Sequence, residues 1–226
     1  MASQSHHNLP PPVPYTRLNV EDAVIIAVDY QEGLFNLARD ILPAKLKSGL
    51  LCHASLATLF NIPIILTTTD DKGPNGPIIR EIREMHPDAP FVRRIGEVNA
   101  FDNPEFRDAL KATGRKQVVI GALLTEVCAT FLALSLRAEG YDVWANLQGS
   151  ASAEKEISDH AYARMRDAGV HVLDSLAISM EMMRDWRNTP GAAEVLPWMD
   201  KYVPSYGSLA RAHLAAVSKA KEENEE

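Results

Sequence analysis

The sequence predicts a three-layer α/β/α sandwich around a doubly wound, mainly parallel sheet of six strands. Short β-type runs alternate along the chain with longer helical patterns, as they do in parallel βαβ units. Three helical patterns end in a glycine shortly before the next β-type run, at Gly114, Gly140 and Gly169, and glycine is the residue that most often ends a helix. The 226 residues are 46% hydrophobic, which is enough for one compact domain with a full core.

Each predicted strand is a short β-type run. The runs are residues 23–28, 62–66, 91–92, 117–120, 142–144 and 170–173. The segments between and after these runs have helical patterns. They are predicted as helices over about residues 44–60, 77–85, 104–113, 126–139, 155–168 and 175–187.

The two ends of the chain differ in composition from the middle and divide it into three parts. These are a proline-rich N-terminal arm, a single domain, and a C-terminal helix with a charged tail, at residues 1–14, 15–206 and 207–226. Asn8–Pro14 is predicted to be an extended polyproline segment. The C-terminal helix is predicted over residues 208–218 because Leu209, Leu214 and Val217 follow a helical period. Such an apolar side suits docking on another surface better than exposure to water.

The charge balance and the cysteine count exclude several classes of protein. A net charge of −7 leaves no large electropositive face for nucleic acid or an anionic membrane. Two cysteines do not make a disulfide framework. Residues 1–14 lack the basic and apolar regions of a secretion signal, and no apolar stretch is long enough to span a bilayer. We therefore expect a cytoplasmic protein.

The segment Val118–Cys128 has the pattern of a reactive site. An apolar run passes through Gly121 and reaches Cys128 where a helical pattern begins, which predicts a buried strand, a tight turn and a cysteine in the first turn of a helix. Unpaired N–H groups and the helix dipole there favour the thiolate, so Cys128 is a candidate nucleophile. The same pattern also fits a buried cysteine that only packs in the core. The pattern by itself does not distinguish a nucleophile from a packing residue.

Residues that directly follow the strands of an open parallel sheet line its reactive edge. In this chain they include Asp29, the stretch 67–70, the pair Arg93 and Arg94, and Cys128. An acid, a cation and a thiol that meet there supply the groups needed for acyl transfer. Asp29 also fits a turn residue, and the two arginines also fit an exposed, solvated pair.

Several motifs, in this order, resemble the isochorismatase-like cysteine hydrolase superfamily, and in particular its YcaC-related amidohydrolase branch. The resemblance covers roughly residues 17–190. The motifs are Val28–Gln31, Gly73–Pro77, Asn99–Asn103, Lys111–Gly114, Gly121–Cys128 and Arg184–Asn188. The resemblance implies an isochorismatase-like, Rossmann-like hydrolase domain at residues 15–206.

The resemblance also implies a triad of Asp29, Arg94 and Cys128, in which Asp29 is the general base and Cys128 the nucleophile. The superfamily usually has lysine where this chain has Arg94, and because arginine does not exchange its proton, the implied role is purely electrostatic. The backbone N–H groups of Leu124 and Cys128 would hold the oxyanion. A cis peptide bond is expected at Leu123–Leu124.

Four further residues are expected near the substrate pocket by their position in the resembled pattern. They are Phe35, Asn99, Phe101 and Glu126. The two phenylalanines fit the core equally well. Relatives commonly carry an aspartate near the end of the fifth strand where this chain has Gln148. The second cysteine, Cys52, lies on a helical pattern without a charged neighbour, so we expect it to pack in the core.

We expect no metal and no other cofactor. Nicotinamidases of the superfamily bind a divalent ion through histidines in the segment after the second strand. The corresponding segment here, Asp70–Gly76, contains no histidine, and histidine is a preferred ligand of zinc and iron.

These features predict a cofactor-free cysteine hydrolase that cleaves a small amide-type (C–N) substrate through a thioester and assembles as a homo-oligomer, a tetramer or an octamer. Two alternatives stay open. An isochorismatase-type vinyl-ether hydrolase shares the fold and the aspartate but needs no nucleophilic cysteine, and the presence of Cys128 argues against it. A catalytically silent oligomeric scaffold or binding protein would be favoured if Asp29 and Cys128 were distant or the pocket closed. The sequence does not identify the substrate.

Overall fold

A parallel six-stranded sheet forms the centre of the protein. The computed structural model describes residues 15–225, with side chains through residue 221, so the predicted polyproline arm lies outside the described residues. The strands are β1 (Ala23–Val28), β2 (Ile64–Thr69), β3 (Phe91–Arg94), β4 (Gln117–Ala122), β5 (Asp142–Asn146) and β6 (His171–Leu173). Every neighbouring pair is parallel, and the order is β3-β2-β1-β4-β5-β6. The order reverses between β1 and β4, which is the topological switch point of the sheet.

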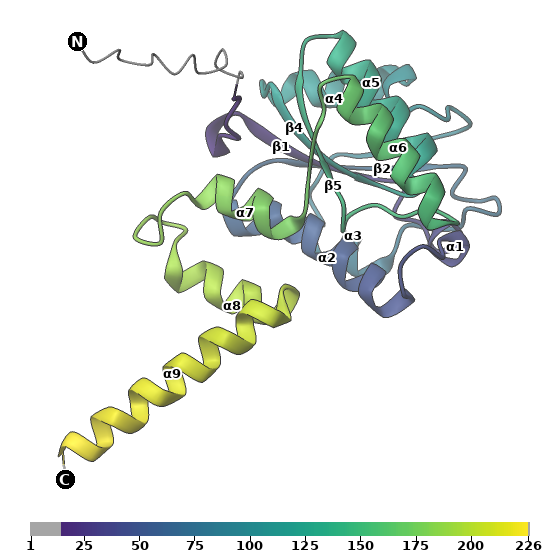
Figure 1. Ribbon diagram of the computed structural model, residues 1–226. Coiled ribbons are helices and arrows are strands. Elements are labelled where there is room, and N and C mark those ends of the chain that lie inside the picture. The colour runs from purple at the N-terminus through teal and green to yellow at the C-terminus, as the bar shows by residue number, and fades with distance from the viewer. Residues whose placement is uncertain (1–14, 226) are drawn as a thin grey trace, which may run out of the picture.

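Helices cover both faces of the sheet, which confirms the predicted three-layer sandwich (Figure 1). One face carries α4 (Pro104–Ala112), α5 (Thr130–Ala138) and α6 (Lys155–Asp167). The other carries α2 (Pro43–Phe60) and α7 (Ser175–Met183), with α3 (Arg80–Met85) beside α2. The shorter elements are α1 (Glu32–Leu37), two 3-10 turns, η1 (Val20–Asp22) and η2 (Ala100–Asp102), and one π-helical turn, η3 (Thr125–Ala129).

Successive strand residues point into two separate cores. In β1, Ile25 and Ala27 pack with α2 and α7, whereas Val24, Ile26 and Val28 pack with α4, α5 and α6. Because both faces are covered, the central strands are apolar throughout, as buried parallel strands are. This explains why the sequence shows continuous apolar runs.

Several helix boundaries differ from the prediction. The predicted helix over residues 126–139 is divided into η3 and α5, and the one predicted over residues 77–85 begins at Arg80. The glycines at 114, 140 and 169 have φ angles of 68°, 82° and 77°, as expected of residues that end helices. Gly121 lies within β4, where it is required because a Cβ there would lie 2.2 Å from the Tyr30 hydroxyl.

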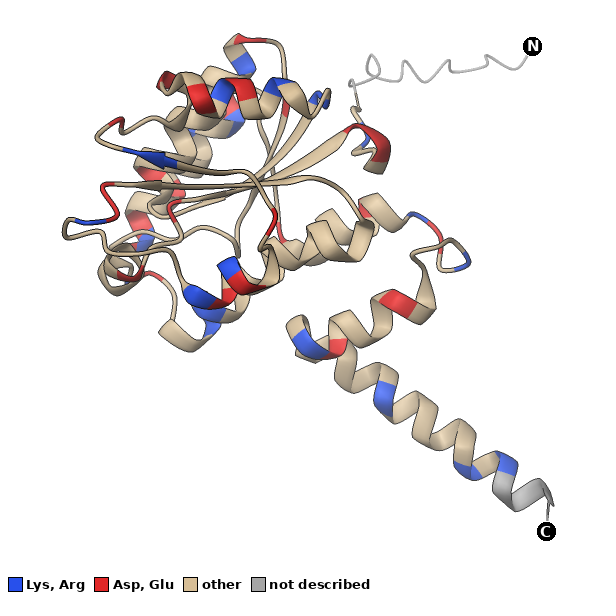
Figure 2. Cartoon of the chain, turned by 180° about the vertical axis from the view of Figure 1, so that it is seen from behind, with Lys and Arg blue, Asp and Glu red and all other residues tan. Residues whose placement is uncertain are grey.

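Two helices at the C-terminal end extend the sandwich. The prediction missed α8 (Ala192–Tyr202), which contains a proline, and α9 (Pro204–Glu225) is longer than the predicted 208–218. α9 packs on α8 and projects away from the sheet (Figure 1). Few charged residues lie on the described part of α9 (Figure 2).

Within the described part of the chain, no helix combines the length and the apolar composition needed to cross a membrane.

Candidate active site

Three strands of the sheet bring Asp29, Arg94 and Cys128 together at one edge. Asp29 directly follows β1, Arg94 is the last residue of β3, and Cys128 lies in η3 just after β4. All three residues are buried. The site lies beside the switch point between β1 and β4, where doubly wound sheets bind their ligands.

Asp29 leaves the extended conformation of β1 as soon as the strand ends. Its φ angle is 56°, in the left-handed region, which aspartate adopts more readily than most residues because its short polar side chain bonds locally. Its N–H donates a hydrogen bond to the Thr67 carbonyl at 2.9 Å, and its own carbonyl accepts one from the Gln31 N–H at 2.7 Å. Asp29 is therefore held on both sides by the backbone.

Arg94 forms a completely buried ion pair with Asp29. Its Nη2 donates to the Asp29 Oδ1. Its Nε donates to the Thr67 hydroxyl at 2.9 Å, and its Nη1 donates to the carbonyls of Glu97 and, at 3.2 Å, Val98. The guanidinium is thus satisfied by fixed acceptors, as a buried cation must be.

The neighbouring arginine faces the other way. Arg93 is 65% exposed at its side chain and lies 3.4 Å from the Asp71 carboxylate. Its guanidinium also lies over the Phe91 ring, 4.9 Å from the ring centre. Successive strand residues point to opposite faces, so only Arg94 reaches Asp29. The alternative that both arginines are exposed and solvated therefore holds for Arg93 alone.

The Asp29 carboxylate interacts with the cation on one side and the thiol on the other. Burial raises the pKa of the Asp29 carboxyl, and the Arg94 charge and the Cys128 thiol oppose that increase without cancelling it. Its second oxygen, Oδ2, is buried and has no hydrogen-bond partner of regular geometry. A carboxylate with a raised pKa and a free oxygen is well suited to accept a proton.

The surroundings of the Cys128 sulfur disfavour its ionisation. Burial raises the pKa of Cys128, and the charge of Asp29 raises it further, while Arg94 and a hydrogen bond from the Leu124 N–H act in the opposite direction. The sequence alone predicted the reverse, a favoured thiolate at a helix N-terminus. The physical reason for the difference is that the π-helical turn buries the sulfur beside a carboxylate, which outweighs the helix dipole.

The peptide bond between Leu123 and Leu124 is cis, which confirms the expectation at that position. The N–H of Leu123 donates to the Val28 carbonyl, and the N–H of Thr125 donates to the Ala151 carbonyl. The N–H of Leu124 is instead directed at the Cys128 sulfur. A backbone donor therefore lies next to the thiol.

A cavity of about 370 Å³ leads to the thiol. Its lining is mostly apolar, with polar groups from the end of β2 and the segment after it, and with no lysine, arginine or histidine. The lining residues are Leu34, Thr69, Asp70, Asn75, Ile95, Gly96, Val98, Leu124, Val127 and Cys128. Thr69 and Asp70 belong to the strand-end stretch that the sequence singled out, whereas Ile95 and Val98 had no signal beyond following the third strand.

The four residues expected near the pocket do not line this cavity. Phe35 and Phe101 pack against the two hydrophobic cores. Asn99 donates to the Ser135 hydroxyl at 2.9 Å and caps η2, and Glu126 accepts a hydrogen bond from the Ser152 hydroxyl. Each side chain thus has a structural contact elsewhere. For the two phenylalanines this is the core alternative that the sequence left open, whereas the contacts of Asn99 and Glu126 had no signal in the sequence.

Two other residues named from the sequence also have structural contacts. The Gln148 side chain accepts a hydrogen bond from the Ser175 N–H at 3.1 Å, so it ties the loop after β5 to α7. Cys52 lies on the buried side of α2 in the core, and burial raises its pKa to about 12. Neither residue is part of the cavity lining.

No metal-binding group is found in the part of the chain that the structure describes. The search covers every cluster of three or more histidine, cysteine, aspartate or glutamate side chains among those residues.

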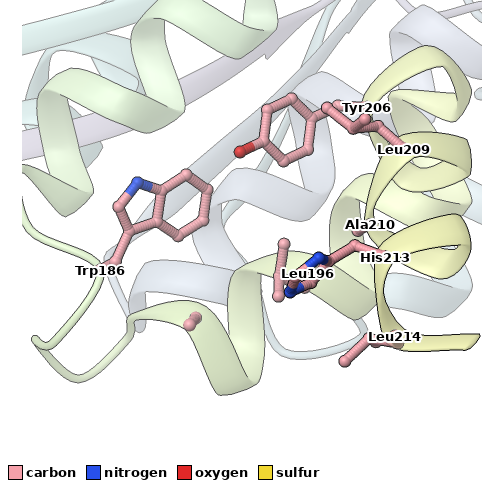
Figure 3. A pocket seen from close by; sticks show the side chains of 8 residues that line it. Trp186, Leu196, Tyr206, Leu209, Ala210, His213 and Leu214 are labelled. Carbon is pink, nitrogen blue, oxygen red and sulfur yellow. The ribbon is translucent and has the colours of Figure 1, made fainter. Parts of the chain in front are cut away.

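A larger cavity, of about 490 Å³, lies away from this site. It is formed by α8, α9 and the segment after α7, and Figure 3 shows Trp186, Leu196, Leu209 and His213 around it. The Trp186 and Tyr206 rings stack with their centres 5.9 Å apart. Its lining contains no carboxylate and no thiol, so it lacks the reactive groups of the Cys128 cavity.

Comparison with known proteins gives consistent matches over most of the chain. The Isochorismatase domain model matches residues 23–176. "Probable hydrolase YcaC" of Escherichia coli is 40% identical over 200 residues, which are 88% of this chain and 95% of the relative.

Two solved structures have the same fold over nearly their whole length. YcaC from Pseudomonas aeruginosa, with hexane-2,5-diol and covalent acrylamide, matches with a TM-score of 0.86 and 38% identity over 89% of this chain and 99% of that one. The Escherichia coli YcaC structure, described as an octameric hydrolase of unknown specificity, matches with a TM-score of 0.87 and 39% identity over 91% of this chain and 100% of that one.

Proposed function

Because this chain belongs to the isochorismatase family and is a hydrolase, we propose that it cleaves a small amide-type substrate with Cys128 as nucleophile and through a thioester. One observation carries the proposal. A buried thiol at the wall of a cavity interacts with a carboxylate that is itself paired with a buried arginine.

In the first half-reaction, Asp29 accepts the Cys128 proton as the sulfur attacks the carbonyl carbon of the substrate. The N–H groups of Leu124 and Cys128 stabilise the negative oxygen that forms. The C–N bond then breaks, and Asp29 returns the proton to the departing amine. Arg94 stays charged throughout, and the acyl group remains on sulfur as a thioester.

In the second half-reaction, water replaces the amine in the cavity. Asp29 accepts a proton from the water while the water oxygen attacks the thioester carbon. The C–S bond breaks, the carboxylic acid leaves, and Asp29 gives the proton back to the sulfur. The sum is an amide and water converted to an acid and an amine, with the neutral thiol restored.

The cavity lining favours a neutral or cationic substrate. It combines apolar side chains such as Leu34 and Val127 with a single carboxylate, Asp70, and contains no basic residue. Isochorismate carries two carboxylates, which such a lining would not stabilise. The vinyl-ether alternative is therefore less well supported than amide hydrolysis, and the open cavity at the thiol argues against a silent scaffold.

We also propose that the chain forms a homo-oligomer in the cytoplasm. The large apolar side chains Leu209 and Leu214 of α9 are 63% and 58% exposed, and they border the cavity of Figure 3. An uncovered apolar patch of this kind is typical of an interface. The Escherichia coli relative is described as an octamer, so a tetramer or an octamer is expected. Both cysteines are unpaired, which supports a reducing compartment.

The proposed function is tested by the pH dependence of Cys128 alkylation with iodoacetamide, itself a small amide. Cys52→Ala serves as the background, so that one thiol remains. The expected result is a rate that reaches its plateau near neutral pH because Asp29 accepts the proton, whereas in Asp29→Asn the rate follows an ordinary thiol titration at higher pH. A Cys128 that alkylates with the same pH profile in both proteins would overturn the proposal.

A positive result leads to a screen for ammonia or amine release from neutral, cationic and anionic small amides. We expect turnover of neutral or cationic members and a mass increase on Cys128 from the acyl group. Turnover that persists in Cys128→Ser would contradict the thioester route.

A further inference from the structure

Thr67 lies on the strand between Arg94 and Asp29, the two charged residues of the site. In the sheet, β2 lies between β3, which carries Arg94, and β1, which leads to Asp29. Thr67 pairs with Val28 on one side and with Val92 on the other, and its side chain is fully buried. Any contact between Arg94 and Asp29 must therefore pass over β2.

Thr67 contacts both members of the ion pair. Its carbonyl accepts the Asp29 N–H at 2.9 Å, and its hydroxyl accepts the Arg94 Nε–H at 2.9 Å. One residue thus holds the backbone of the general base and the side chain of the cation that balances it.

The hydroxyl sets the plane of the guanidinium. Two strand spacings separate β3 from β1, roughly 10 Å in all, so the Arg94 side chain is extended and its end needs fixed contacts. The N–H groups of arginine point in fixed directions within one plane. With Nη1 bound by the carbonyls of Glu97 and Val98 and Nε bound by Thr67, Nη2 is directed at the Asp29 Oδ1.

We propose that Thr67 is a positioning residue for the hydrolase, whose hydroxyl orients Arg94 so that Asp29 stays ionised and able to accept the Cys128 proton. This rests on the proposed role of Asp29 as general base. Without the hydroxyl, the Arg94 Nε–H is buried without an acceptor and the guanidinium turns. Asp29 then loses part of the charge that keeps it ionised, and the pH at which it becomes a base rises.

The next residue along β2 offers a matched control. Thr68 is also fully buried in the same strand, but its hydroxyl has no hydrogen-bond partner. Successive strand residues point to opposite faces, so Thr68 does not reach Arg94. Replacing either threonine with valine keeps the shape of the side chain and removes only the hydroxyl.

The test measures the pH profile of Cys128 alkylation by iodoacetamide in the full chain with Cys52→Ala. Thr67→Val is expected to move the acid limb of the profile to higher pH by about one unit, which lowers the rate about tenfold at a pH on that limb. Thr67→Ser, which restores the hydroxyl, should return the rate to within about threefold of the parent. Thr68→Val should leave the limb unmoved. If Thr67→Val does not fold, Thr67→Ala replaces it with the same expectation.

Each outcome separates the two proposals. If Asp29→Asn changes the profile to an ordinary thiol titration but Thr67→Val behaves as Thr68→Val does, the role of Thr67 is overturned and the function of Asp29 stands. If Thr67→Val moves the limb and Thr67→Ser moves it equally, packing rather than the hydroxyl is responsible, which also overturns the inference. If Asp29→Asn changes nothing, the proposed function itself fails.

Discussion

Two cavities of this protein, one beside Cys128 and one between α8 and α9, differ more in their chemistry than in their size. The Cys128 cavity is about 370 Å³ and has a thiol at its wall and a buried ion pair behind it. The cavity between α8 and α9 is about 490 Å³ and is lined by apolar and aromatic side chains and one histidine. The larger hollow is therefore not the reactive one, and position at a strand edge identifies the candidate active site better than volume does.

The two regions also differ in how they are built. The groups around Cys128 come from four neighbouring strands, β3, β2, β1 and β4, whose ladder of hydrogen bonds holds them in place. The α8–α9 cavity depends on a helix that projects from the sandwich (Figure 1). Catalysis needs groups held in a fixed arrangement, whereas docking needs an accessible apolar surface. The predictions that follow test this division of roles.

The largest effect is expected from the thiol itself. Cys128→Ser should lower kcat/KM for amide hydrolysis at least about a thousandfold, because the hydroxyl is a much weaker nucleophile in the same place. Steady-state kinetics on the best substrate of the screen provides the measurement. Cys52→Ala is the control and should retain activity, since that cysteine lies in the core away from the cavity. Equal losses in both variants would contradict the assignment of Cys128.

The next effect concerns stability and compares one arginine from each region. Arg94→Met leaves Asp29 buried without its cation and should lower the free energy of unfolding by about 3–5 kcal/mol. Arg211→Met removes the partly exposed ion pair with Asp200 that joins α9 to α8, and should cost less than about 1 kcal/mol. Urea unfolding measures both.

The double variant Asp29→Asn with Arg94→Met sharpens this comparison. Because neither charge is then left alone, most of the stability should return while activity stays lost. Recovery of activity along with stability would mean that the ion pair only supports the fold.

A smaller effect, confined to the Cys128 cavity, is expected from pH. The raised pKa of Asp29 means that the carboxyl becomes protonated at a higher pH than an ordinary aspartate as the solution is acidified. A protonated Asp29 accepts no proton, so alkylation of Cys128 should fall about tenfold per pH unit below that pKa. The measurement is the rate of Cys128 alkylation at a series of pH values from about 4 to about 8. A rate that rises only with ordinary thiol ionisation would contradict it.

The smallest effect on the active site is expected from the α9 surface. Leu209→Asp combined with Leu214→Asp places charge on the apolar side of α9 and should dissociate the proposed oligomer, as light scattering after gel filtration would show. Alkylation of Cys128 should change less than about twofold, because α9 does not line its cavity. Loss of both assembly and alkylation would mean that the two regions are coupled.

The fold was largely predictable because its signal is local. The six β-type runs matched the six strands in order, and the helix-ending glycines marked real turns. Strand ends were less predictable, as β2 continues through Thr69, where neighbouring strands supply its hydrogen bonds. The short α1 and the proline-containing α8 were missed since packing, not a strong local pattern, stabilises them.

The residues that meet at the candidate site were predictable from the sequence, but the direction of the pKa shift of Cys128 was not. Asp29, Arg94 and Cys128 follow strands in the sequence, and the parallel order brings such residues to one edge. The resemblance had chosen Arg94 rather than Arg93, and the structure supplies the physical reason, since only the Arg94 side chain is directed at Asp29. The pocket neighbours were the weakest prediction, since Phe35 and Phe101 are partly buried, pack against the two cores and do not line the Cys128 cavity.

By itself, the sequence determined the alternation of strands and helices, the two-sided burial of the sheet and the chemical types available at its edge, since these depend on residues close together in the chain. The tertiary structure alone decided that Arg94 crosses β2 to reach Asp29, that Thr67 contacts both residues, and that burial beside Asp29 raises the pKa of Cys128. Those properties depend on distance and burial between distant segments. Proton affinity and ion pairing change steeply with both.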